Sequence, residues 1–251
     1  MLRAVRAMGR LAHAVVHALA GLFTIVVVFP RLSVDARWLR VQAWATRMLN
    51  IMGITLRVEG TPPVQGPVLL VANHISWLDI LVMHAARHCR FVAKSDIARW
   101  PLIGRLASGA GTLYIERTSR RDALRVVHRM AEGLREGDIV AVFPEGTTSD
   151  GTDVLPFHAN LIQSALSVHA PAQPVALKFV DAATGAQSFA PSYINDDTLV
   201  GSLWRTLTAP RIVAVVRFGD LQQAAGRDRR AWANDLHRAV RQLLDGQPAR
   251  G

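Results

Sequence analysis

Beyond residue 53 the chain alternates short apolar runs with longer segments whose apolar positions recur at helical spacing. Short apolar runs bounded by turn residues are typical of strands, and a 3.6-residue period is typical of amphipathic helices. The pattern predicts strands at 54–59, 67–72, 90–94, 112–116, 139–143, 174–180 and 212–218. It predicts helices at 77–87, 98–108, 120–136, 158–168 and 227–245. The segment 182–210 lacks a clear period and is expected to be a loop.

Strands that alternate with helices predict an α/β domain with a mixed, largely parallel sheet flanked by helices. Ligands of open α/β sheets gather at the carboxyl ends of the strands. Three polar clusters fall at such ends, namely Asn73-His74, Glu116-Arg117 and Pro144-Glu145-Gly146. We therefore expect a functional site where these three clusters meet.

The N-terminal region carries a hydrophobic segment. Residues 11–29 hold no formal charge and follow three arginines, Arg3, Arg6 and Arg10. This length just reaches the thickness of a bilayer core. His13 and the other polar positions inside the segment weaken it as a spanning helix, so both a spanning and an embedded helix stay open.

A second helical pattern covers residues 34–52 and combines Trp38 and Trp44 with interspersed arginines. Tryptophan and arginine on one amphipathic helix suit the membrane interface, although a helix packed on the core is the alternative. We expect residues 1–52 to form an anchor of two membrane-associated helices. Residues 53–251 are expected to form the α/β domain.

Composition narrows the set of partners. The formal net charge is +10, and Lys94 and Lys178 are the only lysines, so arginine supplies most of the positive charge. Arginine favours bidentate capture of phosphate or carboxylate. The arginines are scattered without a basic, aromatic-rich run, so nucleic acid is not expected as a partner, and an anionic membrane or acidic substrate fits better. The lone Cys89 excludes an intramolecular disulfide and suits a reducing cytoplasm.

His74 and Asp79 are the first candidates for chemistry. On one continuous helix, residues five apart point away from each other, so the pair forms only if His74 precedes the helix and Asp79 lies in its first turn. The sequence Ser76-Trp77-Leu78-Asp79 supports that arrangement, because it is typical of a capping box with Ser76 at the N-cap. A capping box alone would also explain Asp79 as a helix stabiliser.

Other chemistries find little support in the chain. The Gly-x-Ser-x-Gly elbow of a serine hydrolase is missing from the sequence, as are P-loop and dinucleotide fingerprints. His84 and His88 lie at a spacing that can bind metal, but no HExxH motif or third ligand accompanies them, so no metal site is expected.

Four segments together resemble the conserved blocks of the glycerolipid acyltransferases, the family that includes 1-acylglycerol-3-phosphate acyltransferases. Asn73-His74-x-x-x-x-Asp79 resembles the first block, and the segment from Gly111 to Arg117 resembles the second. Phe143-Pro144-Glu145-Gly146-Thr147 resembles the third block, and Pro174-Val175 the short fourth one. The match covers residues 54–218 and keeps the order of the blocks.

The resemblance implies a membrane-associated O-acyltransferase in which His74 and Asp79 are catalytic. It implies that the acceptor is bound by a set of residues that comprises Asn73, Arg117, Glu145, Gly146, Thr147 and Thr148. The expected reaction moves a fatty acyl chain from acyl-CoA or acyl-carrier protein to 1-acylglycerol 3-phosphate, giving phosphatidic acid, without a cofactor. The expected location is the cytoplasmic face of a bacterial inner membrane.

Thr148 stands where many members of the family carry arginine, and His158 stands near a position that is often basic. These departures leave the acceptor headgroup open, with a lysolipid such as lyso-ornithine lipid as the alternative. Hydrolysis of a lipid ester and a catalytically inactive lipid-binding scaffold are further alternatives.

Overall fold

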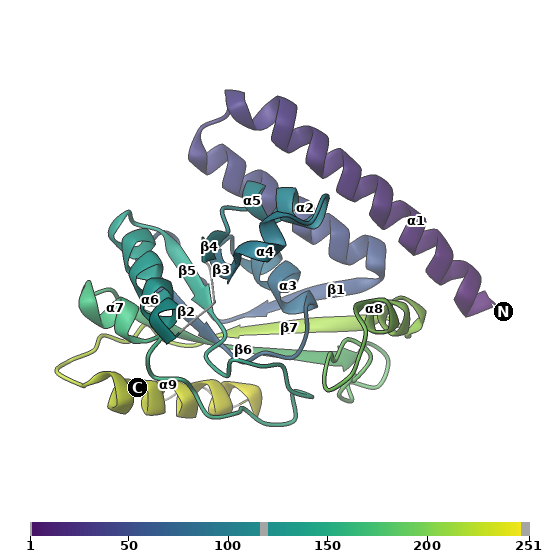
Figure 1. The fold of residues 1–251 in the computed structure, drawn as a ribbon. Coiled ribbons are helices and arrows are strands. Elements are labelled where there is room, and N and C mark those ends of the chain that lie inside the picture. The colour runs from purple at the N-terminus through teal and green to yellow at the C-terminus, as the bar shows by residue number, and fades with distance from the viewer. Residues whose placement is uncertain (1, 116–119, 247–251) are drawn as a thin grey trace.

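The computed structural model in Figure 1 describes residues 2–115 and 120–246. Its centre is a seven-stranded sheet in the order β1-β7-β6-β2-β5-β3-β4. The strands are β1 (Ile54–Glu59), β2 (Val68–Ala72), β3 (Arg90–Lys94), β4 (Leu113–Ile115), β5 (Ile139–Val142), β6 (Ala172–Asp181) and β7 (Ile212–Phe218). Each strand overlaps a predicted one.

Neighbouring strands run parallel except β6 and β7, which are antiparallel. This confirms the mixed, largely parallel sheet. Every residue of β2 and β5 is buried, and the two strands pair directly, with Val71 opposite Val142. Uninterrupted apolar runs are expected for strands covered on both faces, which explains why these two strands carry them.

Helices cover both faces of the sheet (Figure 1). On one face lie α2 (Val34–Met52) and α3 (Leu78–Ala86), and on the other lie α6 (Arg120–Arg135), α7 (Gln163–Ser167) and α9 (Arg229–Leu244). Leu70 packs in the core cluster of α3, whereas its neighbour Leu69 packs in the cluster of α6 and α9. This alternation follows from the two-residue period of a strand.

Three predicted segments differ from the structure. The helix expected at 98–108 is two short helices, α4 (Ser95–Ala98) and α5 (Ile103–Gly109), because Pro101 lacks an amide hydrogen and disfavours helix at the residue before it. The helix expected at 158–168 is reduced to α7. The segment expected to be a loop contains α8 (Leu199–Thr208), whose N-cap Thr198 accepts a hydrogen bond from the amide of Gly201.

The N-terminus forms α1 (Leu2–Phe23), which continues through a π-turn (Thr24–Val28) and a 3-10 turn (Phe29–Arg31). α1 and these two turns together form one continuous helix, Leu2–Arg31, which is long and apolar enough to cross a membrane. The second helix, α2, is present as predicted, but its apolar side chains pack in the core with those of α3. The prediction of two hydrophobic anchor helices was therefore wrong, and one apolar helix remains. The division into an anchor and a domain at residue 52 stays a prediction.

The side chains of α1 fall into three groups, which are buried, exposed and apolar, or basic. Ala7, Ala18 and Gly21 are buried against the rest of the protein. Val16, Leu19 and Phe23 belong to a second face whose apolar side chains are exposed. Arg3 and Arg6 are exposed, whereas Arg10 and His17 contact the protein: Nη1 of Arg10 donates to the carbonyl of Leu207 in α8 at 2.9 Å, and the ring of His17 stacks on Trp44 of α2. An exposed apolar face beside a basic one is typical of helices that lie at a membrane surface.

Candidate active site

His74 lies in the loop between β2 and α3, and Asp79 lies in the first turn of α3. Nδ1 of His74 and Oδ2 of Asp79 are 2.8 Å apart. The same oxygen accepts the main-chain N–H groups of Ile75 at 2.6 Å and Ser76 at 2.9 Å. The expected capping box is half formed, since the hydroxyl of Ser76 accepts from Leu78, not from Asp79. The hydrogen bonds from the main-chain N–H groups of Ile75 and Ser76 thus fix the Asp79 carboxylate next to Nδ1 of His74.

This pairing determines the tautomer of His74. A carboxylate only accepts hydrogen bonds, so Nδ1 carries the hydrogen and Nε2 presents its lone pair. The His74 side chain is 20% exposed, whereas that of Asp79 is fully buried. The arrangement therefore offers a reachable base held by an unreachable carboxylate, which is the geometry needed to take a proton from a hydroxyl group.

Phe143, the first residue after β5, packs against one face of the His74 imidazole. Its ring lies face to face with the imidazole of His74, with 4.1 Å between the centroids and 7° between the planes. Phe91 of β3 stacks behind Phe143 at 5.5 Å. Phe143 had no predicted role of its own, although it ended the predicted strand 139–143 and began the third block, which together indicated that it would lie near the loop of His74.

Glu145 is buried and uses both carboxylate oxygens. Oε1 accepts the N–H of His74 at 2.7 Å, and Oε2 accepts the N–H of Leu155 at 3.0 Å. Burial raises the pKa of the Glu145 carboxyl to about 7, against the opposing effect of these two N–H donors. The structure thus brings Glu145 to His74, and its carboxylate contacts main-chain groups of the protein.

The three residues after Glu145 differ in how far they are exposed. Gly146 and Thr147 are exposed. Gly146 has a φ of 73°, and a Cβ there would come within 2.9 Å of the ring of His158. Thr148 turns inward, where its hydroxyl donates to the carbonyl of Tyr193. Gly146 and Thr147 therefore remain open to a ligand, while Thr148 ties the loop to the segment before α8.

Asn73 is fully buried, and its side chain points into the sheet. Its amide nitrogen donates to the carbonyl of Leu177 at 3.0 Å, and its oxygen accepts the N–H of the same residue at 2.7 Å. These two bonds join the end of β2 to β6. The side chain therefore lies away from the surface that exposes His74.

Arg117 lies outside the described residues, and its role as the binder of an acceptor phosphate stays a prediction. The described part of that block ends with β4 at Ile115, beside β3 in the sheet.

The remaining histidine pair and the cysteine are structural in character. The rings of His84 and His88 stack at 5.3 Å, and burial lowers the pKa of His84 to about 3 and that of His88 to about 4. Both are therefore neutral at physiological pH. Cys89 is buried, and burial raises the pKa of its thiol well above the usual range. Within residues 2–115 and 120–246, no group of three or more His, Cys, Asp or Glu residues is placed to hold a metal ion.

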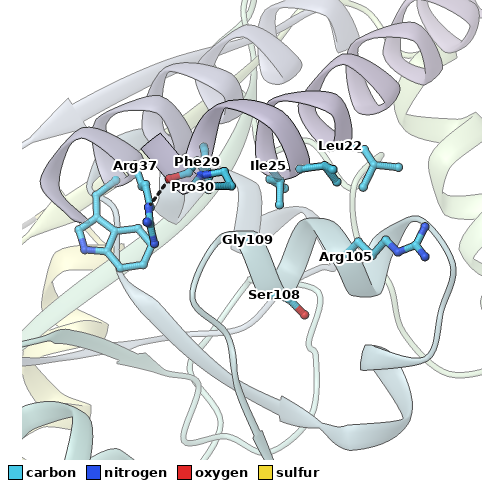
Figure 2. A pocket seen from close by; sticks show the side chains of 10 residues that line it. Leu22, Ile25, Phe29, Pro30, Arg37, Arg105, Ser108 and Gly109 are labelled. Carbon is cyan, nitrogen blue, oxygen red and sulfur yellow. Dashed lines mark hydrogen bonds between the residues drawn. The ribbon is translucent and has the colours of Figure 1, made fainter. Parts of the chain in front are cut away.

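A cavity of about 510 Å³ lies at the C-terminal end of α1, and Figure 2 shows the side chains that line it. Leu22, Ile25 and Phe29 approach it from the first helix, and Arg105 and Gly109 approach it from α5. A second cavity of about 270 Å³ between α1, α2 and α5 reaches His84. Neither cavity is lined by His74 or by the third block, and the candidate site lies instead at the carboxyl ends of the central strands β2 and β5.

A histidine held by a buried carboxylate, in the loop after a strand of a mixed α/β sheet, is able to take a proton from a hydroxyl group. Residues 54–178 match a protein-family model described as Acyltransferase. The chain is 38% identical over 199 residues to the 1-acyl-sn-glycerol-3-phosphate acyltransferase of Neisseria gonorrhoeae, covering 78% of this chain and 77% of that protein. It is 37% identical over 207 residues to the lyso-ornithine lipid O-acyltransferase of Pseudomonas aeruginosa, covering 82% and 78%.

Among solved structures, the chain resembles the 1-acyl-sn-glycerophosphate (LPA) acyltransferase of Thermotoga maritima, with a TM-score of 0.71 over 99% of this chain and 98% of that one. The sequence identity is 17%, so this match supports the fold alone. From the relatives that are more than 30% identical over most of their length, we conclude that the chain belongs to the acyltransferase family and is an acyltransferase.

Proposed function

We propose that this protein transfers a fatty acyl chain from acyl-CoA or acyl-carrier protein to the hydroxyl group of 1-acylglycerol 3-phosphate, giving phosphatidic acid for phospholipid biosynthesis. The observation that carries the proposal is the 2.8 Å bond between Nδ1 of His74 and Asp79, in which the His74 side chain is partly exposed and that of Asp79 is fully buried. The names of the bacterial relatives support a lysolipid acceptor.

In the proposed reaction, Nε2 of His74 takes the proton from the acceptor hydroxyl as its oxygen attacks the thioester carbonyl. The carbon–oxygen bond forms, the carbon–sulfur bond breaks, and the thiolate leaves with the proton that His74 carries. Asp79 stabilises the imidazolium that exists between these two proton transfers. The acceptor oxygen is the nucleophile, so the enzyme does not have to form a covalent intermediate.

The acceptor headgroup is proposed to lie over the exposed rim formed by Gly146 and Thr147. Arg117 is proposed to hold its phosphate through bidentate, charge-assisted hydrogen bonds, as the family resemblance implies. In contrast to the expectation from sequence, we no longer place Asn73 or Thr148 at the acceptor. The side chain of Asn73 is bonded to β6, and the hydroxyl of Thr148 is bonded to Tyr193.

Lyso-ornithine lipid is the second candidate acceptor. The relatives with that activity are as similar to this chain as those that acylate 1-acylglycerol 3-phosphate. The inward position of Thr148 removes one possible phosphate ligand from the rim, and this specific observation favours the alternative.

The proposed location is the cytoplasmic face of a bacterial inner membrane. On α1, Val16 and Phe23 are each 63% exposed and Leu19 is 52% exposed, so the helix presents apolar surface that water does not stabilise. Basic side chains of the same helix would lie at the level of anionic headgroups. We propose that α1 lies in one leaflet of the membrane, which keeps the site close to a lipid acceptor.

The test is an acyl-transfer assay with purified protein, a labelled acyl donor and vesicles that contain one lysolipid at a time. Labelled phosphatidic acid is expected with 1-acylglycerol 3-phosphate. An acylated ornithine lipid alone would establish the second acceptor, and free fatty acid released without any acceptor would indicate hydrolysis. His74→Ala is expected to lower turnover by about 10²- to 10⁴-fold. His128→Ala replaces an exposed histidine on α6 and serves as the matched control.

A further inference from the structure

His74 is held at its ring, its amide and its carbonyl by residues of the segment 143–149, which begins with the third block. The ring of Phe143 stacks on the imidazole at 4.1 Å. The carboxylate of Glu145 accepts the N–H of His74 at 2.7 Å. The carbonyl of His74 accepts the N–H of Ser149 at 2.9 Å and its hydroxyl at 3.3 Å. The ring and the amide of His74 therefore contact residues of the third block, and its carbonyl is bonded to Ser149, two residues beyond that block.

From these contacts we propose that Phe143 and Glu145 are positioning residues for His74, and that neither binds the acceptor. The proposal rests on the function proposed for His74 as the base. It assigns the start of the third block to the orientation of the base, and it leaves the exposed Gly146 and Thr147 to face the acceptor.

The position of His74 explains why such support is needed. The residue lies in a loop beyond the last pairing of β2, so no strand or helix fixes its main chain. A single bond from Nδ1 to Asp79 leaves the ring free to tilt about that contact. The face of Phe143 restricts the tilt, and the bonds from Glu145 and Ser149 fix the main chain. Proton transfer is sensitive to such placement, since an error of about 1 Å can cost about 10²-fold in rate.

The environment of Glu145 argues against a direct contact with the acceptor. The residue is 5% exposed, and each of its oxygens already accepts a main-chain N–H, from His74 and from Leu155. The bond to Leu155 also ties the far end of the loop to the same carboxylate. Glu145 is therefore the point at which the loop of the base and the third block are joined.

Steady-state kinetics distinguish positioning from binding. The assay uses vesicles with 1-acylglycerol 3-phosphate and, in parallel, lyso-ornithine lipid, and compares variants on the acceptor that the parent protein uses. Glu145→Gln and Phe143→Leu are expected to lower kcat by about 10- to 100-fold while the acceptor KM stays within about twofold. Phe143→Tyr keeps the ring and is expected to recover most of kcat. Glu132→Gln, at an exposed glutamate of α6, is the matched control.

A double substitution makes the test specific to His74. If Glu145 acts through the base, Glu145→Gln is expected to have no further effect on the residual turnover of His74→Ala. Equal losses in both backgrounds, or a rise of acceptor KM at unchanged kcat, would overturn the positioning roles alone. Parent-like turnover of His74→Ala would overturn the proposed base as well.

Discussion

The main-chain N–H of His74 donates to Oε1 of Glu145 at 2.7 Å, although 71 positions separate the two residues in the sequence. The contact arises because β2 and β5 are parallel neighbours and end together, with Val71 opposite Val142. Each residue lies three positions beyond that pair. The register of two central strands therefore determines how His74 meets Glu145.

Asp79→Asn is expected to lower turnover by about 10²- to 10⁴-fold and to destabilise the protein by about 1–3 kcal/mol. Oδ2 of Asp79 accepts three N–H groups, and an amide nitrogen in its place would face donors. Acyl-transfer kinetics and urea unfolding of the same preparation measure the two effects. Asp96→Asn on α4 is the control. Normal turnover of Asp79→Asn would exclude an orienting role for the carboxylate.

Arg117→Ala is expected to raise the acceptor KM by about 10- to 100-fold, which corresponds to the loss of a charge-assisted hydrogen bond. The effect is expected only for an acceptor that carries phosphate. Kinetics with phosphate-bearing and ornithine-bearing lysolipids, with Arg125→Ala as a basic control on α6, would reveal it. An equal loss on both acceptors would mean that Arg117 does not read the phosphate.

The raised pKa of Glu145 predicts a dependence of stability on pH. The folded carboxyl titrates at about 7 and the unfolded one at 4.5, so the folded state binds the proton more tightly. Its contribution to stability is fully present below pH 4.5 and is lost as the pH rises to 7, by about 3 kcal/mol at 1.36 kcal/mol per unit. Urea unfolding between pH 5 and 8 tests this. The fall of the free energy of unfolding with rising pH is expected to be smaller in Glu145→Gln. The same fall in the parent and in this variant would show that the Glu145 carboxyl does not cause it.

Gly146→Ala is expected to destabilise the protein by about 1–2 kcal/mol, because φ is 73° at this position and an alanine side chain disfavours it. A clash with the ring of His158 would add to this. The variant His158→Ala removes the ring but not the backbone strain. About 1 kcal/mol of the loss is therefore expected to persist when both are changed. Complete recovery in the double variant would show that the clash alone was responsible.

Leu19→Glu and Phe23→Glu are expected to weaken binding of the protein to anionic vesicles by at least about 10-fold, since each change replaces buried hydrocarbon with charge in the lipid. Both side chains are more than half exposed, so the fold is expected to tolerate the changes. Vesicle sedimentation measures binding, and circular dichroism checks the fold. Leu124→Glu, at an exposed leucine of α6, is the control, and equal loss in that variant would exclude α1 as the contact.

The sequence predicted the elements whose signal is local. The strands of the sheet are apolar runs with turn residues around them, and the pairing of His74 with Asp79 was supported by a capping sequence of four residues, Ser76 to Asp79. α8 was missed because its apolar side chains are divided between buried and exposed faces, as at Leu207 and Val200. The break between α4 and α5 has a local signal in Pro101, which disfavours helix at the residue before it.

The contacts of Glu145 and Asn73 could not be predicted, because they depend on strand order. Glu145 meets His74 because β5 lies beside β2, and Asn73 meets Leu177 because β6 lies on the other side of β2. Neither adjacency has a signature in a single sequence. Hydrogen bonds between segments far apart in the chain therefore assigned these two side chains to the framework of the site, where the family blocks had suggested substrate contacts.

Cys89 has a practical consequence. It is the only cysteine of the chain, and it is buried, with a thiol whose pKa is raised by that burial. Thiol reagents react with exposed thiolates, so we expect Cys89 of the native protein not to react with them. A single cysteine introduced along the exposed side of α1 would carry a fluorescent or spin probe to a known place, and its environment would report how deeply that helix lies in lipid.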